Sequence, residues 1–131
     1  MMENKKIQST SLEMYKEHIL DLYKNPLNFG KLEKPTHKHK EINSLCGDDI
    51  TVYLEIKDNR IRDIKFTAKG CAISIASASL ITEKIKGMNI NEVKQLNEES
   101  IKKLLKIPIT YTRIKCALLP LEAIKGALKK S

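Results

Sequence analysis

Four residues with metal-ligating or nucleophilic side chains stand out in the sequence: Cys46, Asp48, Cys71 and Cys116. Three thiolates and one carboxylate oxygen form a donor set that can hold zinc or iron in tetrahedral geometry. Gly47 would let the backbone turn so that Cys46 and Asp48 face one centre. The spacing contains no Cys-x-x-Cys pair, so it leaves two alternatives open, a shared metal site and three unrelated thiols.

The elements that position these residues follow from the hydrophobic periodicity. Residues 50–57 and 64–69 alternate apolar and polar side chains, and Asp58-Asn59 between them predicts an antiparallel hairpin. Cys46 precedes the first strand. Cys71 lies in the turn between the second strand and a helix of small residues that Gly87 ends. The metal-ligating side chains are therefore expected at the ends of elements.

Helices are predicted on both sides of this hairpin. A capping box over residues 10–13 is expected to begin an amphipathic helix that ends near Asn25-Pro26, and residues 27–43 are expected to form a loop with a short edge strand. Asn91 is expected to cap a short helix, and another short helix ends before Pro108. The prediction is an α+β fold, a small antiparallel sheet with helices packed on one face.

Pro120 is the feature that we use to place the start of the last helix. Proline lacks an amide hydrogen and is tolerated in the first turn of a helix, so we expect this helix to begin no earlier than Ala117. Cys116 would then lie at its N-cap or just before it. The helix dipole would favour the thiolate of both Cys71 and Cys116, and Lys69 and Lys115 would act in the same direction.

Length and composition suit one domain that is large enough to bury a hydrophobic core. The chain has 131 residues, 41% hydrophobic and 31% charged. No apolar segment of the signal-peptide type follows Met1, and the most apolar stretch, residues 71–81, is too short to cross a bilayer. Three cysteines, an odd number, argue against a disulfide-stapled secreted module. A cytoplasmic protein without membrane association is therefore expected.

The net charge of +8 raises the alternative of a basic, zinc-binding nucleic-acid module. The lysines are scattered and alternate with acids, which favours a solvated surface or docking to an acidic protein. The absence of Trp weakens any interpretation based on base stacking, so no nucleic acid is expected. Two further alternatives are a thiol enzyme with a Cys/His pair and an inert structural zinc domain. His37 and His39, in the basic segment, are expected to be surface residues.

Four segments, in this order, resemble the IscU/SufU/NifU family of iron–sulfur cluster assembly proteins. They are Tyr23-Lys24-Asn25-Pro26-Leu27-Asn28-Phe29-Gly30, Cys46-Gly47-Asp48, Gly70-Cys71-Ala72-Ile73-Ser74-Ile75-Ala76-Ser77-Ala78-Ser79 and Arg113-Ile114-Lys115-Cys116. The resemblance implies a SufE/NifU-like two-layer sandwich and a single iron–sulfur cluster assembly scaffold domain over residues 1–131. It also implies that the chain accepts persulfide sulfur from a cysteine desulfurase of the SufS or IscS/NifS type. A downstream apo-protein or cluster carrier would receive the cluster.

By the same resemblance, Cys46, Asp48, Cys71 and Cys116 are the ligands of zinc, iron or a transient iron–sulfur cluster such as a 2Fe–2S cluster. Gly47, Arg113 and Lys115 would stand beside them. The sulfur acceptor is Cys46 by resemblance to the SufU type and Cys116 by resemblance to the IscU type. We favour Cys46, and Asp48, as the weakest ligand, would tune how readily the metal site opens.

Two departures favour the SufU type, which binds zinc and relays sulfur. Lys115 stands where the IscU type has a histidine, and the segment from Lys106 to Thr110 lacks the second proline of the IscU chaperone-docking motif, so no dedicated Hsp70 chaperone is expected. The 45 residues between the last two cysteines, however, leave no room for the usual SufU insertion. The sequence leaves open a cluster scaffold and a zinc-dependent sulfurtransferase, and hence whether the protein is an enzyme.

Overall fold

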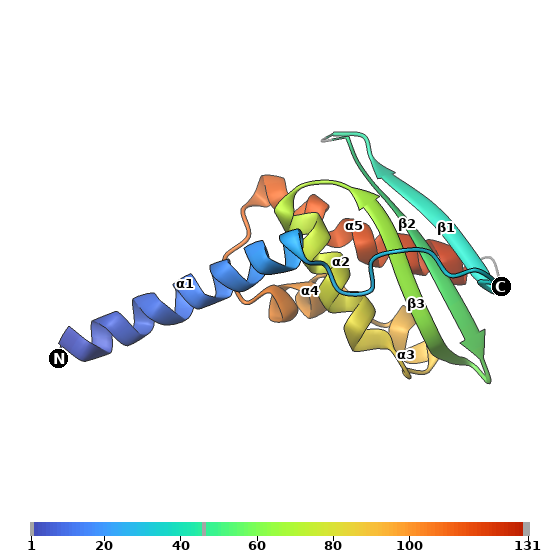
Figure 1. Cartoon of the computed structure of the whole chain (residues 1–131), viewed down its shortest axis with the longest axis horizontal. Coiled ribbons are helices and arrows are strands. Elements are labelled where there is room, and N and C mark those ends of the chain that lie inside the picture. The colour runs from blue at the N-terminus through green and yellow to red at the C-terminus, as the bar shows by residue number, and fades with distance from the viewer. Residues whose placement is uncertain (1, 46, 130–131) are drawn as a thin grey trace.

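The computed structural model describes residues 2–45 and 47–129. Within them the chain forms a three-stranded sheet and a set of helices (Figure 1). The elements are α1 (Met2–Lys24), β1 (His37–Asn43), β2 (Asp48–Lys57), β3 (Arg60–Lys69), α2 (Ala72–Ile85), α3 (Ile90–Lys94), α4 (Glu98–Leu105) and α5 (Tyr111–Leu128).

The sheet is antiparallel with the strand order β1-β2-β3. The predicted hairpin is confirmed as β2 and β3. Its turn residues, Asp58 and Asn59, adopt φ angles of 54° and 61°, the left-handed conformation that suits the twist of a tight hairpin. The predicted edge strand is β1, which begins at His37. Asp48 pairs with Asn43 at the end of the sheet opposite the Asp58-Asn59 turn, so the connection between β1 and β2 lies at the end that carries Asp48.

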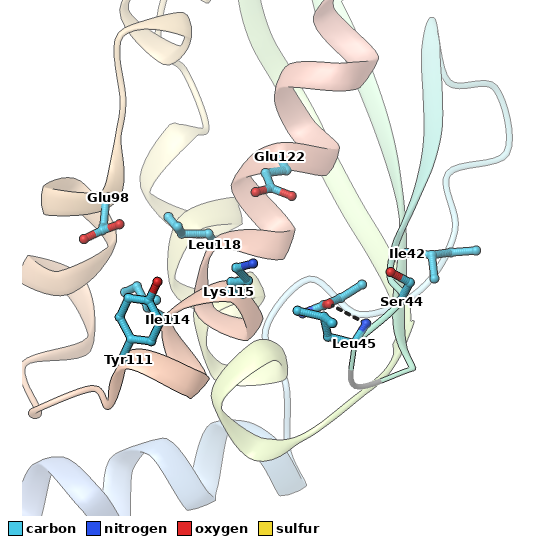
Figure 2. A pocket seen from close by; sticks show the side chains of 10 residues that line it. Ile42, Ser44, Leu45, Glu98, Tyr111, Ile114, Lys115, Leu118 and Glu122 are labelled. Carbon is cyan, nitrogen blue, oxygen red and sulfur yellow. Dashed lines mark hydrogen bonds between the residues drawn. The ribbon is translucent and has the colours of Figure 1, made fainter.

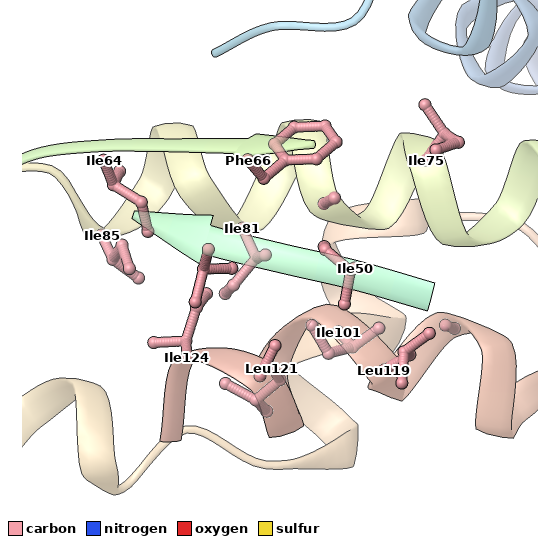
Figure 3. Packing of buried hydrophobic residues seen from close by; sticks show 14 of the residues in the cluster. Ile50, Ile64, Phe66, Ile75, Ile81, Ile85, Ile101, Leu119, Leu121 and Ile124 are labelled. Carbon is pink, nitrogen blue, oxygen red and sulfur yellow. The ribbon is translucent and has the colours of Figure 1, made fainter. Parts of the chain in front are cut away.

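One face of the sheet is covered by α2 and α5 (Figure 1). Period-two alternation turns Ile50, Val52 and Leu54 of β2 toward these helices, and all three are almost fully buried. Figure 3 shows side chains from the sheet and helices packed against one another there, among them Ile64, Phe66, Ile81, Ile85, Leu121 and Ile124. Burying each of these large apolar side chains contributes about 1.5–3 kcal/mol. The predicted α+β fold with helices on one face is confirmed.

The segment between α1 and β1 crosses the sheet from the β3 edge to the β1 edge (Figure 1). It first runs beside β3, where the Phe66 amide donates to the Asn28 carbonyl at 3.0 Å and the Gly30 amide donates to the Phe66 carbonyl at 2.8 Å. At the other edge, the Thr36 amide donates to the Leu54 carbonyl at 2.8 Å. Tyr53, whose side chain lies on the face away from the helices, is also buried, and the Lys38 ammonium lies 5.4 Å from the centre of its ring.

The predicted starts of the first helix and of α3 are wrong. The first helix begins at Met2, not at the capping box over residues 10–13, because the residues before that box are also good helix formers and no proline or glycine stops the helix there. The cap of α3 is Asn89, whose side chain accepts from the Asn91 amide at 2.8 Å. Asn89 and Asn91 are both suitable capping residues, and the packing of Ile90 and Val93 selects the earlier one.

Candidate metal centre

Three of the four predicted ligands meet at one end of the sheet. One carboxylate oxygen of Asp48 and the sulfurs of Cys71 and Cys116 all lie within 4.8 Å of one another. Asp48 is the first residue of β2, Cys71 precedes α2, and Cys116 lies in α5. Cys71 is half-buried and Cys116 is buried. Cys46, the fourth predicted ligand, lies outside the described residues.

Sheet register brings Asp48 and Cys71 together. Asp49 pairs with Lys69 across β2 and β3, so Asp48 and the residues that follow Lys69 lie at the same end of the sheet. Cys71 is the N-cap of α2, and its carbonyl accepts from the Ile75 amide at 3.1 Å. Its thiol therefore stands at the N-terminus of a helix.

Cys116 does not lie at a helix start, and this prediction is wrong. The last helix begins at Tyr111, after the N-cap Thr110, and Pro120 lies inside it. The prediction assumed that proline is tolerated only in the first turn of a helix, where its missing amide hydrogen matters least. Proline inside a helix costs about 3 kcal/mol. The packing of α5 against β1, β2 and α2 offsets this cost. Cys116 is 4% exposed in the second turn, so packing, and not a helix terminus, determines its surroundings.

Asn43 makes two hydrogen bonds to the chain between β1 and β2. Its side-chain oxygen accepts from the Leu45 amide at 3.1 Å, and its carbonyl accepts from the Gly47 amide at 2.8 Å. Gly47 has a φ of +76°, a left-handed conformation that glycine adopts without strain. The expected role of Gly47 in turning the backbone thus agrees with its conformation, and both neighbours of Cys46 in the chain have fixed partners.

Ser74 is a polar residue at this centre that the sequence did not single out. Its hydroxyl lies 3.2 Å from the Asp48 carboxylate oxygen Oδ2 and 3.8 Å from the Cys71 sulfur. The side chain is 4% exposed. A serine three residues after a cysteine at a helix N-cap falls in the first turn, on the side of that cysteine, and this spacing was the available indication.

A pocket of about 300 Å³ leads to Cys116, and a neighbouring pocket of about 490 Å³ continues from it. Figure 2 shows Leu45 and Tyr111 on opposite sides of the larger pocket, with Lys115 between them. Leu45 is 77% exposed and Tyr111 is 89% exposed. Lys115 lines both pockets, whereas Arg113, also exposed, lines neither. The buried thiol of Cys116 is therefore approached from the side that Lys115 occupies.

Glu122 adds an unusual carboxyl group to the larger pocket. Partial burial raises the pKa of the Glu122 carboxyl, and the nearby charge of Glu41 raises it further, while Lys115 lowers it. Glu41 itself lies 2.7 Å from the Nε2 atom of His39. The two carboxyl groups that line the pocket itself, Glu98 and Glu122, come from α4 and α5.

His39 is more enclosed than the sequence predicts. Its ring lies so close to the backbone of α5 that a Cβ atom at Gly126 would be 2.4 Å from Nε2, and its Nδ1 atom is buried without a hydrogen-bond partner among the described residues. The expected surface role is therefore wrong for His39, because β1 packs against α5 through this side chain. His39 is not part of the group formed by Asp48, Cys71 and Cys116.

The donor set fits a metal ion that prefers sulfur. A zinc ion about 2.3 Å from each of two sulfurs would hold them about 3.8 Å apart in tetrahedral geometry. The donor atoms of Asp48, Cys71 and Cys116 lie within 4.8 Å of one another, so small side-chain movements bring them to that spacing. These three donors account for three of the four tetrahedral positions, and Cys46, the fourth predicted ligand, lies outside the described residues. Iron accepts the same mixture of sulfur and oxygen donors.

Comparison with known proteins places this geometry in a family. The family model of the NifU-like N-terminal domain matches residues 14–131. The chain belongs to this family. The match includes Asp48, Cys71 and Cys116 and nearly all of the described fold.

Relatives and solved structures agree with that assignment. The chain is 40% identical over 134 residues to the iron–sulfur cluster assembly scaffold protein IscU of Thermotoga maritima, covering 89% of this chain and 94% of the relative. It is 35% identical over 131 residues to the iron–sulfur cluster assembly enzyme IscU of Drosophila melanogaster, covering 95% and 82%. The crystal structure of FiSufU, a SUF-system protein of Fervidobacterium islandicum AW-1, is 31% identical with a TM-score of 0.72, covering 86% and 94%.

The same fold also occurs in a NifU-like protein of Brucella abortus, with a TM-score of 0.73. None of the helices in the described part of the chain is both long and apolar enough to cross a membrane.

Proposed function

We propose that this protein supports iron–sulfur cluster assembly by accepting persulfide sulfur and holding zinc or a nascent cluster at Cys46, Asp48, Cys71 and Cys116. The observation that carries the proposal is the convergence of Asp48, Cys71 and Cys116 from three separate elements within 4.8 Å. Relatives at 35–40% identity that are named IscU support the same function. The proposed unit is one domain over residues 1–131, acting in the cytoplasm.

Sulfur transfer requires an accessible thiolate. The thiolate attacks the outer sulfur of a persulfide on the cysteine desulfurase, a new S–S bond forms, and the desulfurase cysteine leaves as a thiolate. We propose Cys46 as the acceptor. Cys116 is the alternative acceptor, and the pocket beside Lys115 gives its buried sulfur a route to solvent.

The occupant of the site is proposed from donor chemistry. Zinc and iron both accept two or three thiolates with one carboxylate, and a bound zinc ion would keep the thiolates deprotonated. A 2Fe–2S cluster would be cargo, assembled there and passed to an apo-protein or cluster carrier. Asp48 is the hard oxygen donor among soft sulfurs, so it is the ligand expected to exchange most readily.

A sulfur-transfer assay tests the proposal. The full chain is mixed with a cysteine desulfurase and radiolabelled cysteine and is then separated on a non-reducing gel. Label is expected on this chain and is expected to disappear in Cys46→Ser; loss in Cys116→Ser with retention in Cys46→Ser would reassign the acceptor. Lys24→Ala, on the exposed surface of α1, is the matched control. No label on the unmodified chain would overturn the proposal.

A zinc-dependent sulfurtransferase without a scaffold role is the second candidate. The observation that favours it is Lys115, which stands one position before Cys116 and lines both pockets, where an IscU-type histidine would add a metal ligand. Elemental analysis and reconstitution separate the candidates. Iron with sulfide, and transfer of a cluster to an apo-ferredoxin, are expected for a scaffold, whereas zinc alone with persulfide transfer is expected for a sulfurtransferase.

A further inference from the structure

A buried hydroxyl lies between the carboxylate and the thiol of the candidate metal centre. The Ser74 Oγ atom is 3.2 Å from Asp48 Oδ2, 3.1 Å from the Cys71 carbonyl and 3.8 Å from the Cys71 sulfur. Ser74 and Asp48 are 4% and 8% exposed, so little water competes for these contacts. The three acceptors belong to the two residues that β2 and α2 bring to the site.

One serine hydroxyl has one hydrogen to donate, so these acceptors compete for it. A carboxylate is a stronger acceptor than a neutral carbonyl or thiol, because the hydrogen bond is charge-assisted. The Ser74 hydroxyl therefore donates to the Asp48 carboxylate at Oδ2. This bond fixes the orientation of a carboxylate that would otherwise rotate about its side-chain torsions.

The backbone beside this contact leaves no room for another side chain. A Cβ atom at Gly70 would lie 2.4 Å from the Ser74 Oγ atom, and 3.2 Å and 3.3 Å from the Asp48 atoms Cγ and Oδ2. Gly70 has no positive φ that would require glycine, so its conformation does not explain the residue. The absence of a side chain is what allows Ser74 and Asp48 to approach each other here.

We propose that Ser74 is a positioning residue that holds the Asp48 carboxylate in place for the metal or cluster. The hydroxyl donates to Oδ2 and fixes the orientation of the carboxylate, whose other lone pairs stay available to a metal ion. This inference rests on the proposed function, because it assumes that Asp48 is a ligand. The metal affinity of the centre would then depend on Ser74, a residue that is not itself a ligand.

Cobalt(II) binding to the full chain provides the test. Removing a hydrogen-bond partner of a metal ligand lowers affinity about 10–100-fold. Ser74→Ala is therefore expected to weaken cobalt binding by that factor and to alter the ligand-field absorption bands. The sulfur-to-cobalt charge-transfer bands are expected to remain, because Cys71 and Cys116 are unchanged. Ser74→Thr keeps the hydroxyl and is expected to restore most of the affinity.

Ser79→Ala is the matched control. Ser79 is also buried in α2, but its hydroxyl accepts from the Leu27 amide at 3.1 Å, away from the metal centre. It is expected to leave cobalt affinity unchanged. The decisive comparison uses an Asp48→Ala background, where adding Ser74→Ala is expected to have no further effect, because Ser74 acts through Asp48.

The outcomes separate this inference from the proposed function. If the unmodified chain binds neither cobalt nor zinc, the metal site itself is wrong and both fail. If the unmodified chain binds cobalt and Ser74→Ala binds it with the same affinity, only the positioning role is overturned. The same holds if Ser74→Ala lowers cobalt affinity by the same factor with Asp48 present and in the Asp48→Ala background. Should Ser74→Ala fail to fold, Gly70→Ala becomes the test variant. Its Cβ atom displaces the hydroxyl, so the same loss of affinity is expected.

Discussion

The hydroxyl of Ser77 donates a hydrogen bond of 2.6 Å to the carbonyl of Ala117. Ser77 is buried in α2, the helix that Cys71 caps, and Ala117 follows Cys116 directly in α5. The bond therefore ties together the two helices that carry the two described thiols. It fixes their spacing at the depth of the core, where a small shift of one helix would move its cysteine relative to the other.

Ser77→Ala is expected to destabilise the chain and to loosen the metal centre. One buried hydrogen bond contributes about 1 kcal/mol to the free energy of unfolding, so a loss of that size is expected by chemical denaturation. Zinc affinity is expected to fall as well. Ser79→Ala, which removes the acceptor of the Leu27 amide, should lower stability without changing zinc affinity. Equal zinc affinity in Ser77→Ala and Ser79→Ala would show that the hydrogen bond from Ser77 does not set the spacing of the two thiols.

The contact between His39 and Gly126 predicts a strong effect of adding one methyl group. Gly126→Ala would place a Cβ atom 2.4 Å from His39 Nε2, so the His39 ring or the packing of β1 on α5 would have to shift. Overpacking of this kind destabilises by about 1–3 kcal/mol. His39→Ala in the same chain removes the clash, so the double variant is expected to be more stable than Gly126→Ala alone.

Thermal unfolding of the four chains in this double-mutant cycle measures the coupling between the two residues. Additive effects of the two substitutions would contradict the packing contact. His39→Ala alone also removes the 2.7 Å contact with Glu41, so its own effect is subtracted in the cycle.

Glu122 predicts a pH dependence of stability. Its pKa is raised in the folded chain, chiefly by partial burial, so the folded state binds a proton more readily than the unfolded state. Stability attributable to this group is therefore present below the ordinary pKa of 4.5 and is lost as pH rises through the raised value. Glu122→Gln is expected to be more stable than the unmodified chain at neutral pH, with the difference shrinking as the solution is acidified.

Denaturant unfolding at several pH values measures this difference. Lys115 lowers the pKa of Glu122 and so opposes the effect of burial. In a chain that keeps Glu122, Lys115→Ala is therefore expected to increase the pH dependence of the free energy of unfolding. A stability difference for Glu122→Gln that grew toward low pH would contradict a raised pKa of Glu122 in the folded chain.

Asn28 anchors the segment that crosses the sheet. Its amide nitrogen donates to the Thr82 hydroxyl at 3.0 Å and to the Glu83 carboxylate at 3.2 Å, and its backbone has a φ of 61°. Asn28→Ala is expected to lower the free energy of unfolding by about 1–2 kcal/mol, because it loses these bonds and places alanine in the left-handed region. Asn28→Gly relieves the backbone strain and isolates the hydrogen-bond contribution in thermal unfolding.

The same contact has a predictable response to acid. The hydrogen bond from Asn28 is the largest cause of the lowered pKa of Glu83, with Lys86 acting in the same direction. A lowered folded pKa stabilises the chain above the ordinary value of 4.5, and that contribution is lost as pH falls through the lowered value. The deficit of Asn28→Ala is therefore expected to shrink in acid; a constant deficit would mean that Glu83 takes no part.

Local rules were sufficient for the sheet and for α2. Alternation of Ile50, Val52 and Leu54 defines a strand with one buried face, and the Asp58-Asn59 turn fixes its partner, because both depend only on neighbouring residues. Local rules failed at the first and last helices. A proline inside a helix has a free-energy cost that local rules predict, but the tertiary packing that offsets this cost cannot be predicted from neighbouring residues.

The sequence by itself determined which side chains can bind a metal and that Cys71 follows a strand and begins a helix. Only the tertiary structure decided that Cys116 lies inside α5 and that its sulfur meets Asp48 and Cys71. It also decided that Ser74 contacts Asp48, 26 residues away in the chain. The physical reason is that these contacts join residues distant in sequence, and their distances depend on how α2 and α5 pack on the sheet, not on any local preference.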